Sequence, residues 1–367
     1  MSLSSPTPAR DFQVVRLDLP LDSATFDSML GAAPGVTLTV GEPHGATAGE
    51  AATWRALATA HAYHVSSARD DLPQPWFVAA PLLQRCPELL VVSSYGAGYD
   101  TVDVDACTAA GVCVVNQAGS NAGAVAEHAF GLMLGLSRRI GECDRRLRRG
   151  EKFTRLDAVG TDLDGRTLGI VGIGHAGRRV AQLGRAFGMT VIACDPFVDA
   201  AEVHARGAEP VAFAELLARA DVVSLHCPLD ASTAGLFDAS AFAAMKPGAL
   251  FVTTARGGVH DEEALFAALR PGHLGGAGLD VWLTEPPTAS HPLLLLDNVL
   301  ATHHIAGVTH GSRRQMASMA ASQLIAAARG ERPPRLINPQ VWPAFVERFA
   351  RAFSPALPPT AAPLLST

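Results

Sequence analysis

One stretch of the sequence restricts the fold more than any other. In residues 168–195 an apolar run, LGIV, leads into Gly172, Gly174 and Gly177, then into a segment with helical apolar spacing and a second apolar run that ends at Asp195. Glycines at this spacing permit a tight turn, a close approach of the backbone to a phosphate, and close packing of the next helix on a sheet. By itself this glycine string is a weak signal, because a chain with 34 glycines contains some such strings by chance. Its flanking strand, helix and acid are what predict a dinucleotide-binding β–α–β unit.

The acid at position 195 bears on which dinucleotide is bound. It lies roughly twenty residues after the glycines, where a carboxylate can accept both hydroxyls of an adenosine ribose. The same charge would repel a 2′-phosphate, so we expect NAD (NADH) and consider NADP less favoured. Arg178 and Arg179 lie near enough in the sequence to complicate this preference.

Composition narrows the class of protein. The 367 residues are 48% apolar, which is enough for two domains, and the net charge of −6 gives no positive field for nucleic acid or an anionic membrane. A small-molecule partner is the natural expectation. The cysteines are scattered, without CxxC pairs or metal-ligand spacing, so we expect reduced thiols, no metal site and a cytoplasmic protein without an export or anchor segment. They are Cys86, Cys107, Cys113, Cys143, Cys194 and Cys227.

Short apolar runs alternate with helical spacing along the chain. The last of five such runs ends near residue 117, and six more runs, from TLGIVGIG to NVLATHH, follow residue 165. The pattern predicts an α/β protein with two doubly wound parallel sheets covered by helices on both faces. We expect the helical stretch 312–329 to pack on the first domain, and Pro333, Pro334 and the tail after Pro355 to form poorly ordered surface.

A single long helix is predicted from about Asn121 to Arg149, and its last turns are strongly basic. The basic residues suggest either an anion site or a solvated face that complements the helix dipole, and we favour the second interpretation. They are Arg145, Arg146, Arg148 and Arg149.

Candidate catalytic residues follow the strands of the second sheet. Arg256 follows ALFVTTA, Glu285 comes shortly after GAGLDVW, and His303 and His304 close NVLATHH. Ligands of such sheets bind at the carboxyl ends of strands. Reduction of a carbonyl needs a proton donor and a cation, and a carboxylate beside an imidazole raises the pKa of that imidazole. Taken singly, each residue also fits a structural role, so the joint placement carries the hypothesis.

From about Leu89 to Pro339 the chain resembles the D-isomer-specific 2-hydroxyacid dehydrogenases. The matching motifs include YGAGYDTVD, AGSNAGAVAEHA, DLDGRTLGIVGIGHAGRRVA, MKPGALFVTTARGG, GAGLDVWLTEPP and NVLATHHIAGVT. The resemblance implies a Rossmann NAD-binding domain, residues 119–307, inserted in a flavodoxin-like substrate-binding domain, residues 1–118 and 308–367. It also implies an active site in the cleft between domains, and a homodimer formed through residues 121–160.

The resemblance assigns roles to individual residues. It implies that His304 is the acid/base, that Glu285 tunes it, and that Arg256 binds the carboxylate and carbonyl of the substrate. The substrate would also contact Tyr95, Gly96, Ala97 and Gly98. The implied cofactor-binding set is Gly172, Gly174, His175, Ala176, Gly177, Asp195, Cys227, Pro228, Thr233, Thr254, Ala255, Arg256, Asp280, His304 and Gly307.

Three departures from the family pattern put the substrate preference in doubt or alter the active-site loop. His303 stands where the family usually has proline, Thr253 stands where it has asparagine, and Phe153 is the nearest residue to a usual tryptophan. Glyoxylate, hydroxypyruvate, 3-phosphohydroxypyruvate and branched or aromatic keto acids all remain possible. No separate regulatory domain is expected after Arg329. The alternatives are an NADH-sensing corepressor-like binding protein and a formate- or phosphite-type dehydrogenase of the same fold.

Overall fold

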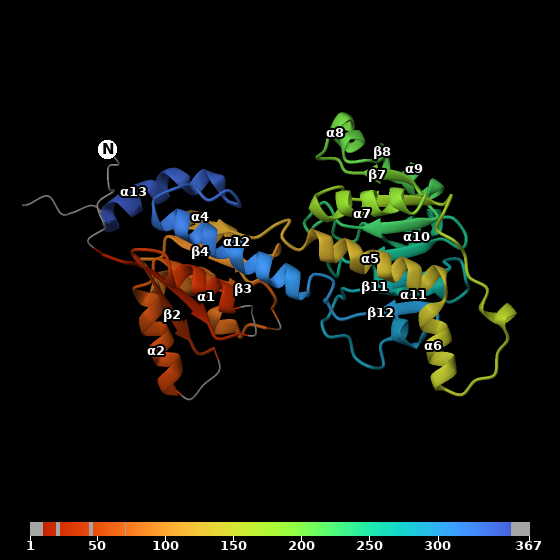
Figure 1. Cartoon of the computed structure of the whole chain (residues 1–367), viewed down its shortest axis with the longest axis horizontal. Coiled ribbons are helices and arrows are strands. Elements are labelled where there is room, and N and C mark those ends of the chain that lie inside the picture. The colour runs from red at the N-terminus through yellow and green to blue at the C-terminus, as the bar shows by residue number, and fades with distance from the viewer. Residues whose placement is uncertain (1–9, 20–22, 44–46, 70, 354–367) are drawn as a thin grey trace, which may run out of the picture. The chain divides into compact units, whose positions relative to one another are not determined.

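The computed structural model describes residues 10–19, 23–43, 47–69 and 71–353. The chain forms two compact units, one from the residues up to Ser120 and from Arg313 onward, the other from Asn121 to Ser312 (Figure 1). The chain therefore passes between the units after Ser120 and after Ser312. The resemblance suggests junctions after residues 118 and 307.

The first unit is built on a five-stranded parallel sheet in the order β2-β1-β3-β4-β5. This is the flavodoxin-like order of a doubly wound sheet. Along β1, Val15 and Leu17 enter one core while Phe12 and Val14 enter the other, which is the alternation that a sheet covered on both faces requires. The strands are β1 (Phe12–Leu17), β2 (Val36–Gly41), β3 (Ala62–Ser66), β4 (Val91–Tyr95) and β5 (Cys113–Val115).

Helices cover both faces of this sheet. One face carries α2 (Thr47–Ala58), η1 (Gln74–Trp76), α3 (Ala80–Arg85) and α4 (Val104–Ala109). The other carries α1 (Ser23–Gly31), α12 (His310–Ala328), η4 (Pro339–Val341) and α13 (Trp342–Phe353).

The last helices correct part of the sequence prediction. As predicted, α12 packs on the first unit, where Ala317 and Leu324 share a core with Phe12. The sequence did not predict α13, whose Phe345 is fully buried in the same core. Pro333 is also buried, so the prediction of poorly ordered surface was wrong there, while the tail after Pro355 lies outside the described residues.

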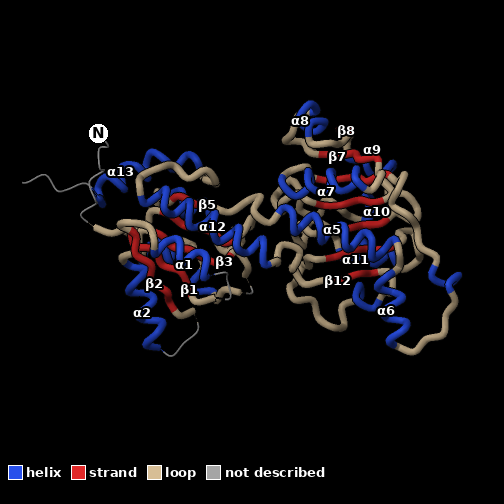
Figure 2. Tube along the Cα trace, viewed as in Figure 1, coloured by secondary structure: helices blue, strands red, loops and turns tan. Residues whose placement is uncertain are grey.

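The second unit contains a seven-stranded parallel sheet in the order β12-β11-β10-β9-β6-β7-β8 (Figure 2). Counted from β6, this is the Rossmann order 3-2-1-4-5-6 with one strand added at the far edge. Six strands were predicted. The missed strand, β8, has two residues and ends in proline at the sheet edge, so no apolar run announces it. The strands are β6 (Thr167–Val171), β7 (Thr190–Cys194), β8 (Glu209–Pro210), β9 (Val222–Leu225), β10 (Leu250–Thr253), β11 (Gly276–Leu279) and β12 (Val299–Ala301).

Two cores lie on the two faces of this second sheet. Helices α5 and α7, side by side in Figure 1, pack on one face, and α9, α10 and α11 pack on the other. The helices of this unit are α5 (Ala122–Ser137), α6 (Ile140–Arg148), η2 (Arg155–Ala158), α7 (His175–Ala186), α8 (Ala200–Ala205), α9 (Phe213–Arg219), α10 (Ala239–Ala244), α11 (Glu262–Leu269) and η3 (Pro292–Leu295).

The single helix predicted over 121–149 is broken in two. Arg139 adopts a left-handed conformation with φ of 53°, and its guanidinium pairs with Glu142 at 2.7 Å. The carbonyl of Ser137 accepts a hydrogen bond from the backbone N of Thr161 at 2.7 Å, so the returning chain takes the place of a further helical turn. Local sequence spacing contains no information about this distant partner.

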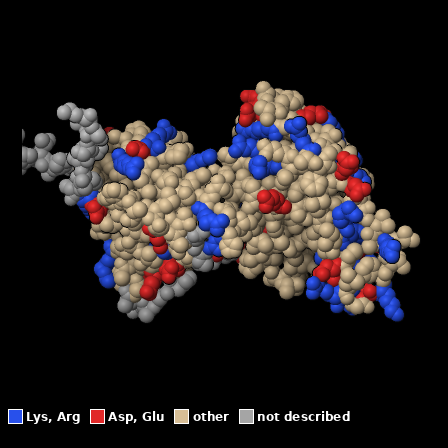
Figure 3. Space-filling model, in the orientation of Figure 1, with Lys and Arg blue, Asp and Glu red and all other residues tan. Residues whose placement is uncertain are grey.

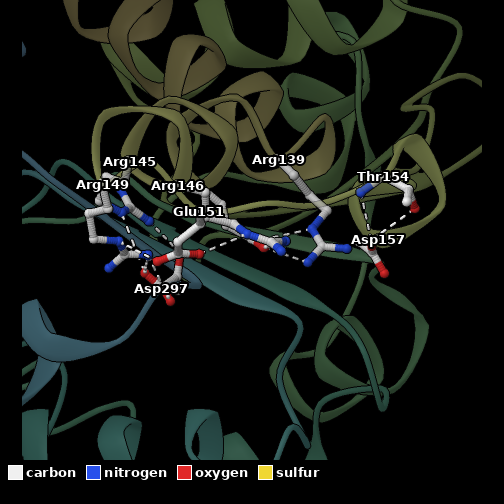
Figure 4. A network of polar contacts seen from close by, with 9 residues as sticks. Arg139, Arg145, Arg146, Arg149, Glu151, Thr154, Asp157 and Asp297 are labelled. Carbon is white, nitrogen blue, oxygen red and sulfur yellow. Dashed lines mark hydrogen bonds and ion pairs between the residues drawn. The ribbon is translucent and has the colours of Figure 1, made fainter.

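The four arginines near the end of α6 pair with acidic side chains, and Figure 4 shows three of them, Arg145, Arg146 and Arg149. Each of the four has a carboxylate partner. The pairs are Arg145–Asp297 at 3.7 Å, Arg146–Glu142 at 3.4 Å, Arg146–Glu151 at 3.2 Å, Arg148–Asp144 at 2.8 Å, Arg149–Glu151 at 2.7 Å and Arg149–Asp297 at 3.3 Å.

Surface and cysteine chemistry follow the composition. On the face drawn in Figure 3, basic and acidic side chains are interspersed and neither sign forms a continuous field. All six cysteines lie in the described ranges and none forms a disulfide. Within those ranges, every helix is too short or too polar to span a bilayer.

Candidate active site

The glycine turn begins where β6 ends. Gly172 has a φ of +86°, and a Cβ there would lie 2.8 Å from the backbone N of Cys227. A Cβ at Gly177 would overlap the Gly172 carbonyl oxygen, so only glycine lets α7 begin this close to the strand. At Gly174, the N-cap of α7, no described atom lies within 4 Å of a Cβ position. Bare backbone is thus presented at the positive end of a helix, which suits a pyrophosphate.

Asp195 lies directly after β7 and is half-buried. Its Oδ2 accepts a hydrogen bond from the N of Ile173 and its Oδ1 accepts one from the N of Phe197, both at 3.0 Å. A carboxylate has about four acceptor positions, so about two remain for other donors. Arg206 donates to the carbonyl of Ile173 at 2.8 Å, which fixes the turn residue from its other side.

The arginines that the sequence analysis singled out beside this turn have protein partners. Arg178 lies 3.2 Å from the Nδ1 of His175, and Arg179 donates to Gln182 at 2.6 Å. Arg206, which the sequence analysis missed, is the cation bonded to the turn itself. Its position 33 residues after Ile173 follows no motif spacing.

The remaining predicted cofactor residues of this unit follow other strands. Cys227 and Pro228 come after β9, Thr254 and Ala255 after β10, and Asp280 directly after β11. The Thr233 hydroxyl donates to the carbonyl of Pro228 at 2.7 Å and accepts from the N of Asp230 at 2.9 Å, so it shapes its own loop. At Gly307 a Cβ would lie 2.7 Å from the Nδ2 of Asn121.

His304 and Glu285 form a hydrogen-bonded pair. Glu285 Oε2 lies 2.8 Å from His304 Nδ1, and since a carboxylate only accepts, we assign the hydrogen to Nδ1. Glu285 Oε1 accepts from the N of Trp282 at 3.0 Å. The hydrogen bond that His304 donates to Glu285 raises the pKa of His304 against the lowering effect of burial. Burial would raise the pKa of Glu285, but the hydrogen bond and charge of His304 bring it below its ordinary value. The geometry therefore favours a protonated imidazole.

A buried carboxylate holds the backbone that carries this imidazole. His304 has a φ of 47°, a conformation uncommon for a residue with a side chain. Asp280, which is fully buried, accepts from the N of Ile305 and the N of Ala306, both at 2.9 Å, and from the Thr302 hydroxyl at 2.7 Å. The N of His304 also donates to the Asp280 carbonyl at 2.6 Å, so Asp280 fixes Thr302 and the three consecutive residues His304, Ile305 and Ala306.

His128 of α5 completes this arrangement. Its Nε2 lies 2.9 Å from the Thr302 hydroxyl. Because that hydroxyl donates to Asp280, it accepts from His128, whose Nε2 therefore carries a hydrogen. Sequence reasoning missed His128 and this role of Asp280. Only the AEHA motif, quoted for the resemblance, drew attention to the position.

The charge of Arg256 acts on the same imidazole. The next residue, Gly257, packs so tightly on Trp282 that a Cβ would overlap the Trp282 carbonyl. The loops that follow β10 and β11 therefore run against each other. The pKa of His304 is raised chiefly by Glu285 and is lowered in part by the charge of Arg256. The structure thus gathers Arg256, Glu285 and His304 at the carboxyl ends of neighbouring strands, as the sequence suggested.

The four predicted substrate residues of the first unit are consecutive: Tyr95 ends β4, and Gly96, Ala97 and Gly98 begin the loop after it. Gly96 has a φ of +100°, which favours glycine. Tyr95 donates to the carbonyl of Arg313 at 3.4 Å. Ala97 and Gly98 continue the loop, and their carbonyls accept from Asn116 Nδ2 at 2.7 Å and from Ser94 Oγ at 2.9 Å. The loop is rigidly tied to its own unit.

The structure also shows the surroundings of the three residues that depart from the family pattern. His303 is exposed, and its charge is one of the lesser influences that lower the pKa of Glu285 below the value that burial would give. Thr253 is buried, and its hydroxyl accepts from the N of Ala255 at 3.4 Å. Phe153 packs under the guanidinium of Arg146, whose Cζ lies 4.2 Å from the ring centre. Among the described residues, no cluster of three or more His, Cys, Asp or Glu side chains is placed to hold a metal ion.

Comparison with known proteins agrees with this geometry. Residues 130–306 match the model of the D-isomer specific 2-hydroxyacid dehydrogenase, NAD binding domain. The chain is 44% identical to the D-3-phosphoglycerate dehydrogenase of Mycobacterium leprae over 261 residues. These residues make up 71% of this chain and 49% of that protein. The chain thus spans about half the length of the phosphoglycerate dehydrogenases it matches.

Two further relatives are covered more fully. The glyoxylate reductase of Korarchaeum cryptofilum is 39% identical over 267 residues, which make up 72% of this chain and 80% of that protein. The crystal structure of a glyoxylate reductase from Paecilomyes thermophila superposes with a TM-score of 0.78 at 31% identity, over 89% of this chain and 99% of that one. With the glycine turn and the strand-end residues described above, these similarities show that the chain belongs to the D-isomer specific 2-hydroxyacid dehydrogenase family.

Proposed function

We propose that the protein catalyses the reversible reduction of a 2-keto acid to a D-2-hydroxy acid with NADH. The observation that carries the proposal is the 2.8 Å hydrogen bond between His304 Nδ1 and Glu285 Oε2. This pair lies beside Arg256 and at the same edge of the parallel sheet as the glycine turn. A proton donor, a cation and a dinucleotide-binding turn on one sheet edge are the parts that carbonyl reduction by a nicotinamide cofactor requires.

The residues divide the work of the reaction. Bound NADH supplies the hydride that forms the new bond at the carbonyl carbon. His304 gives the proton of its Nε2 to the carbonyl oxygen as the C=O π bond breaks, and takes it back in the reverse direction. Glu285 keeps Nδ1 protonated and compensates the imidazolium charge. Arg256 binds the carboxylate of the keto acid and polarises its carbonyl.

The residues present fit NADH. Gly172 and Gly177 leave no room for a side chain, and Gly174 leaves open space, so the backbone can meet a pyrophosphate. About two acceptor positions of the Asp195 carboxylate are unused, and they match the two ribose hydroxyls of adenosine. Its negative charge disfavours a 2′-phosphate, so we propose NADH in preference to NADPH. Arg206, fixed on the Ile173 carbonyl, is the cation that opposes this preference.

The substrate is proposed only as a class. The loop after β4 binds the carboxylate through the N–H groups of Ala97 and Gly98, and Arg256 binds the same carboxylate. Glyoxylate and phosphoglycerate, the acids in the names of the relatives, both carry such a carboxylate. A panel of 2-keto acids with NADH and with NADPH, followed by absorbance of the reduced cofactor, identifies the substrate.

Two neighbouring histidines provide a matched test. We expect His304→Ala to lower kcat by ~10²-fold or more and to leave NADH binding, measured by cofactor fluorescence, unchanged. His303→Ala removes an exposed imidazole from the same loop and serves as the control. Unchanged turnover in His304→Ala would exclude the assigned acid/base. Tight NADH binding without oxidation by any 2-keto acid would contradict the whole proposal and favour a sensor of NADH.

We also propose that the protein is a homodimer through the 121–160 region. Four large apolar side chains there are 59–83% exposed, and together they offer apolar surface that a second copy of the chain could bury. A molar mass of twice the chain in light scattering is the expected result, and a monomer at micromolar concentration would contradict it. The exposed side chains are Ile140, Leu147, Leu156 and Val159.

A further inference from the structure

The loop after β4 is held by its carbonyl groups. The carbonyl of Gly96 accepts from the N of Gln117 at 2.7 Å. The carbonyl of Ala97 accepts from Asn116 Nδ2 at 2.7 Å, and that of Gly98 from Ser94 Oγ at 2.9 Å. Three consecutive peptide groups are therefore fixed by three different donors of the first unit.

Fixing a carbonyl also fixes the N–H that follows it. A trans peptide is planar, and its N–H points opposite to its C=O. The three anchored carbonyls consequently direct the N–H groups of Ala97, Gly98 and Tyr99 away from the anchors. In the part of the chain that the structure describes, the N–H groups of Ala97 and Gly98 have no acceptor. Two fixed donors with open hydrogen-bonding capacity are a receptor for an anion.

Gln117 holds both peptide groups that flank the Cα of Gly96. Its backbone N binds the carbonyl of Gly96, and its Oε1 accepts from the N of Gly96 at 2.7 Å. Its Nε2 donates to Ser93 Oγ at 3.3 Å, and His64 Nδ1 lies 3.0 Å from the same hydroxyl. All three side chains are buried, with at most 2% exposed.

The burial of this chain of hydrogen bonds makes it stiff. Buried polar groups cost free energy unless each one is paired, so Gln117, Ser93 and His64 each depend on the others. His64 is further fixed by stacking on Phe26, with ring centres 4.4 Å apart. A rotation of the Gln117 amide would leave the buried N of Gly96 without an acceptor. The side chain therefore has one permitted orientation.

We propose that Gln117 is a positioning residue for the carboxylate of the substrate. Its side chain fixes the N of Gly96, the residue at which the loop that presents the N–H groups of Ala97 and Gly98 begins, and it does so without touching the substrate itself. The inference rests on the proposed function, because it takes this loop to bind a 2-keto acid. It adds a residue to which neither the glycine turn nor the strand-end residues point.

The test replaces Gln117 with methionine, which keeps the length of the side chain and removes both hydrogen bonds. We expect the KM for the keto acid, and the Ki of oxamate as a carboxylate probe, to rise about 10- to 100-fold, since about one hydrogen bond to a charged group is weakened. The Kd of NADH should stay unchanged, because the cofactor turn belongs to the second unit. A folding defect alone would not separate these constants.

Thr53→Val is the matched control. Thr53 is also buried in the first unit, and its hydroxyl accepts from the N of Glu42 at 3.0 Å and donates to the carbonyl of Gly49 at 3.1 Å. It has no bond to the loop after β4 or to the residues that anchor it, so its replacement should lower stability with little change in KM. A rise in KM that is equal in both variants would overturn the proposal, as would an unchanged KM in folded Gln117→Met.

Ser93→Ala provides a second variant if Gln117→Met fails to fold. It removes the hydroxyl beneath the Gln117 amide and leaves the bond from Gly96 in place. We expect a smaller rise in KM and in the Ki of oxamate, again with NADH binding unchanged, and no rise would overturn the proposal. If no 2-keto acid supports NADH oxidation by the wild-type protein, the proposed function itself is contradicted, so the two failures are distinguishable.

Discussion

Replacement of Asp195 with alanine tests the cofactor assignment through a quantity that follows from the structure. Two of about four acceptor positions of its carboxylate are occupied by the backbone N–H groups of Ile173 and Phe197. A hydrogen bond to a charged group contributes about 1.5–3 kcal/mol, so two bonds to ribose hydroxyls amount to about 3–6 kcal/mol. We therefore expect the Kd of NADH to rise by on the order of 10²–10⁴.

NADPH provides the internal control of this experiment. Loss of the carboxylate also removes its repulsion of a 2′-phosphate, so NADPH binding should be retained or strengthened. The assay is titration of cofactor fluorescence with both nucleotides. Equal weakening of the two would refute the charge argument, because it would show that the turn had merely lost its shape.

Asp199 supplies a matched variant on the same segment. It is exposed and caps α8, where its Oδ1 accepts from the N of Glu202 at 2.8 Å. Asp199→Ala removes the same charge and one backbone hydrogen bond, but at a site without a proposed contact to ribose. A change in the NADH to NADPH ratio as large as that of Asp195→Ala would refute the assignment.

Three further changes have defined outcomes. Reduction needs protonated His304 and is lost as pH rises through its pKa; because Glu285 raises that pKa, Glu285→Gln should move the loss of kcat/KM to lower pH, and an unmoved pH profile would contradict the pairing. Thr302→Val should lower kcat by about tenfold through the His304 loop while Thr302→Ser retains it, and equal kcat values would exclude this support. Burial lowers the pKa of His260 to about 4, and neither ring nitrogen has a partner among the described residues. The free energy of unfolding therefore falls as the pH drops from 6.5 toward 4, by about 3 kcal/mol in full. Urea unfolding of His260→Leu should show a gain of about 1–3 kcal/mol at pH 7.5 that widens at pH 5; a constant difference would contradict the linkage.

The sequence predicted those parts of the fold that depend on neighbouring residues. The strand, glycine turn, helix and acid of residues 168–195 are consecutive, so hydrophobic spacing and glycine chemistry were sufficient to predict them. Elements without such a local pattern were missed. β8 has two residues, and α5 ends because Thr161, 24 positions further on, takes the Ser137 carbonyl.

The same distinction applies to the site. Arg256, Glu285 and His304 were found because each follows a strand, and the carboxyl ends of parallel strands meet at one edge of a sheet. What sequence could not supply is the support of these residues. His128 and Thr302 are 174 positions apart, and Gly96 and Gln117 are 21 apart with no motif that pairs them. The sequence alone determined which chemical groups reach the sheet edge, because strand ends follow from local pattern. Only the tertiary structure decided which buried hydrogen bonds orient them, because those partners become neighbours only when the chain is folded.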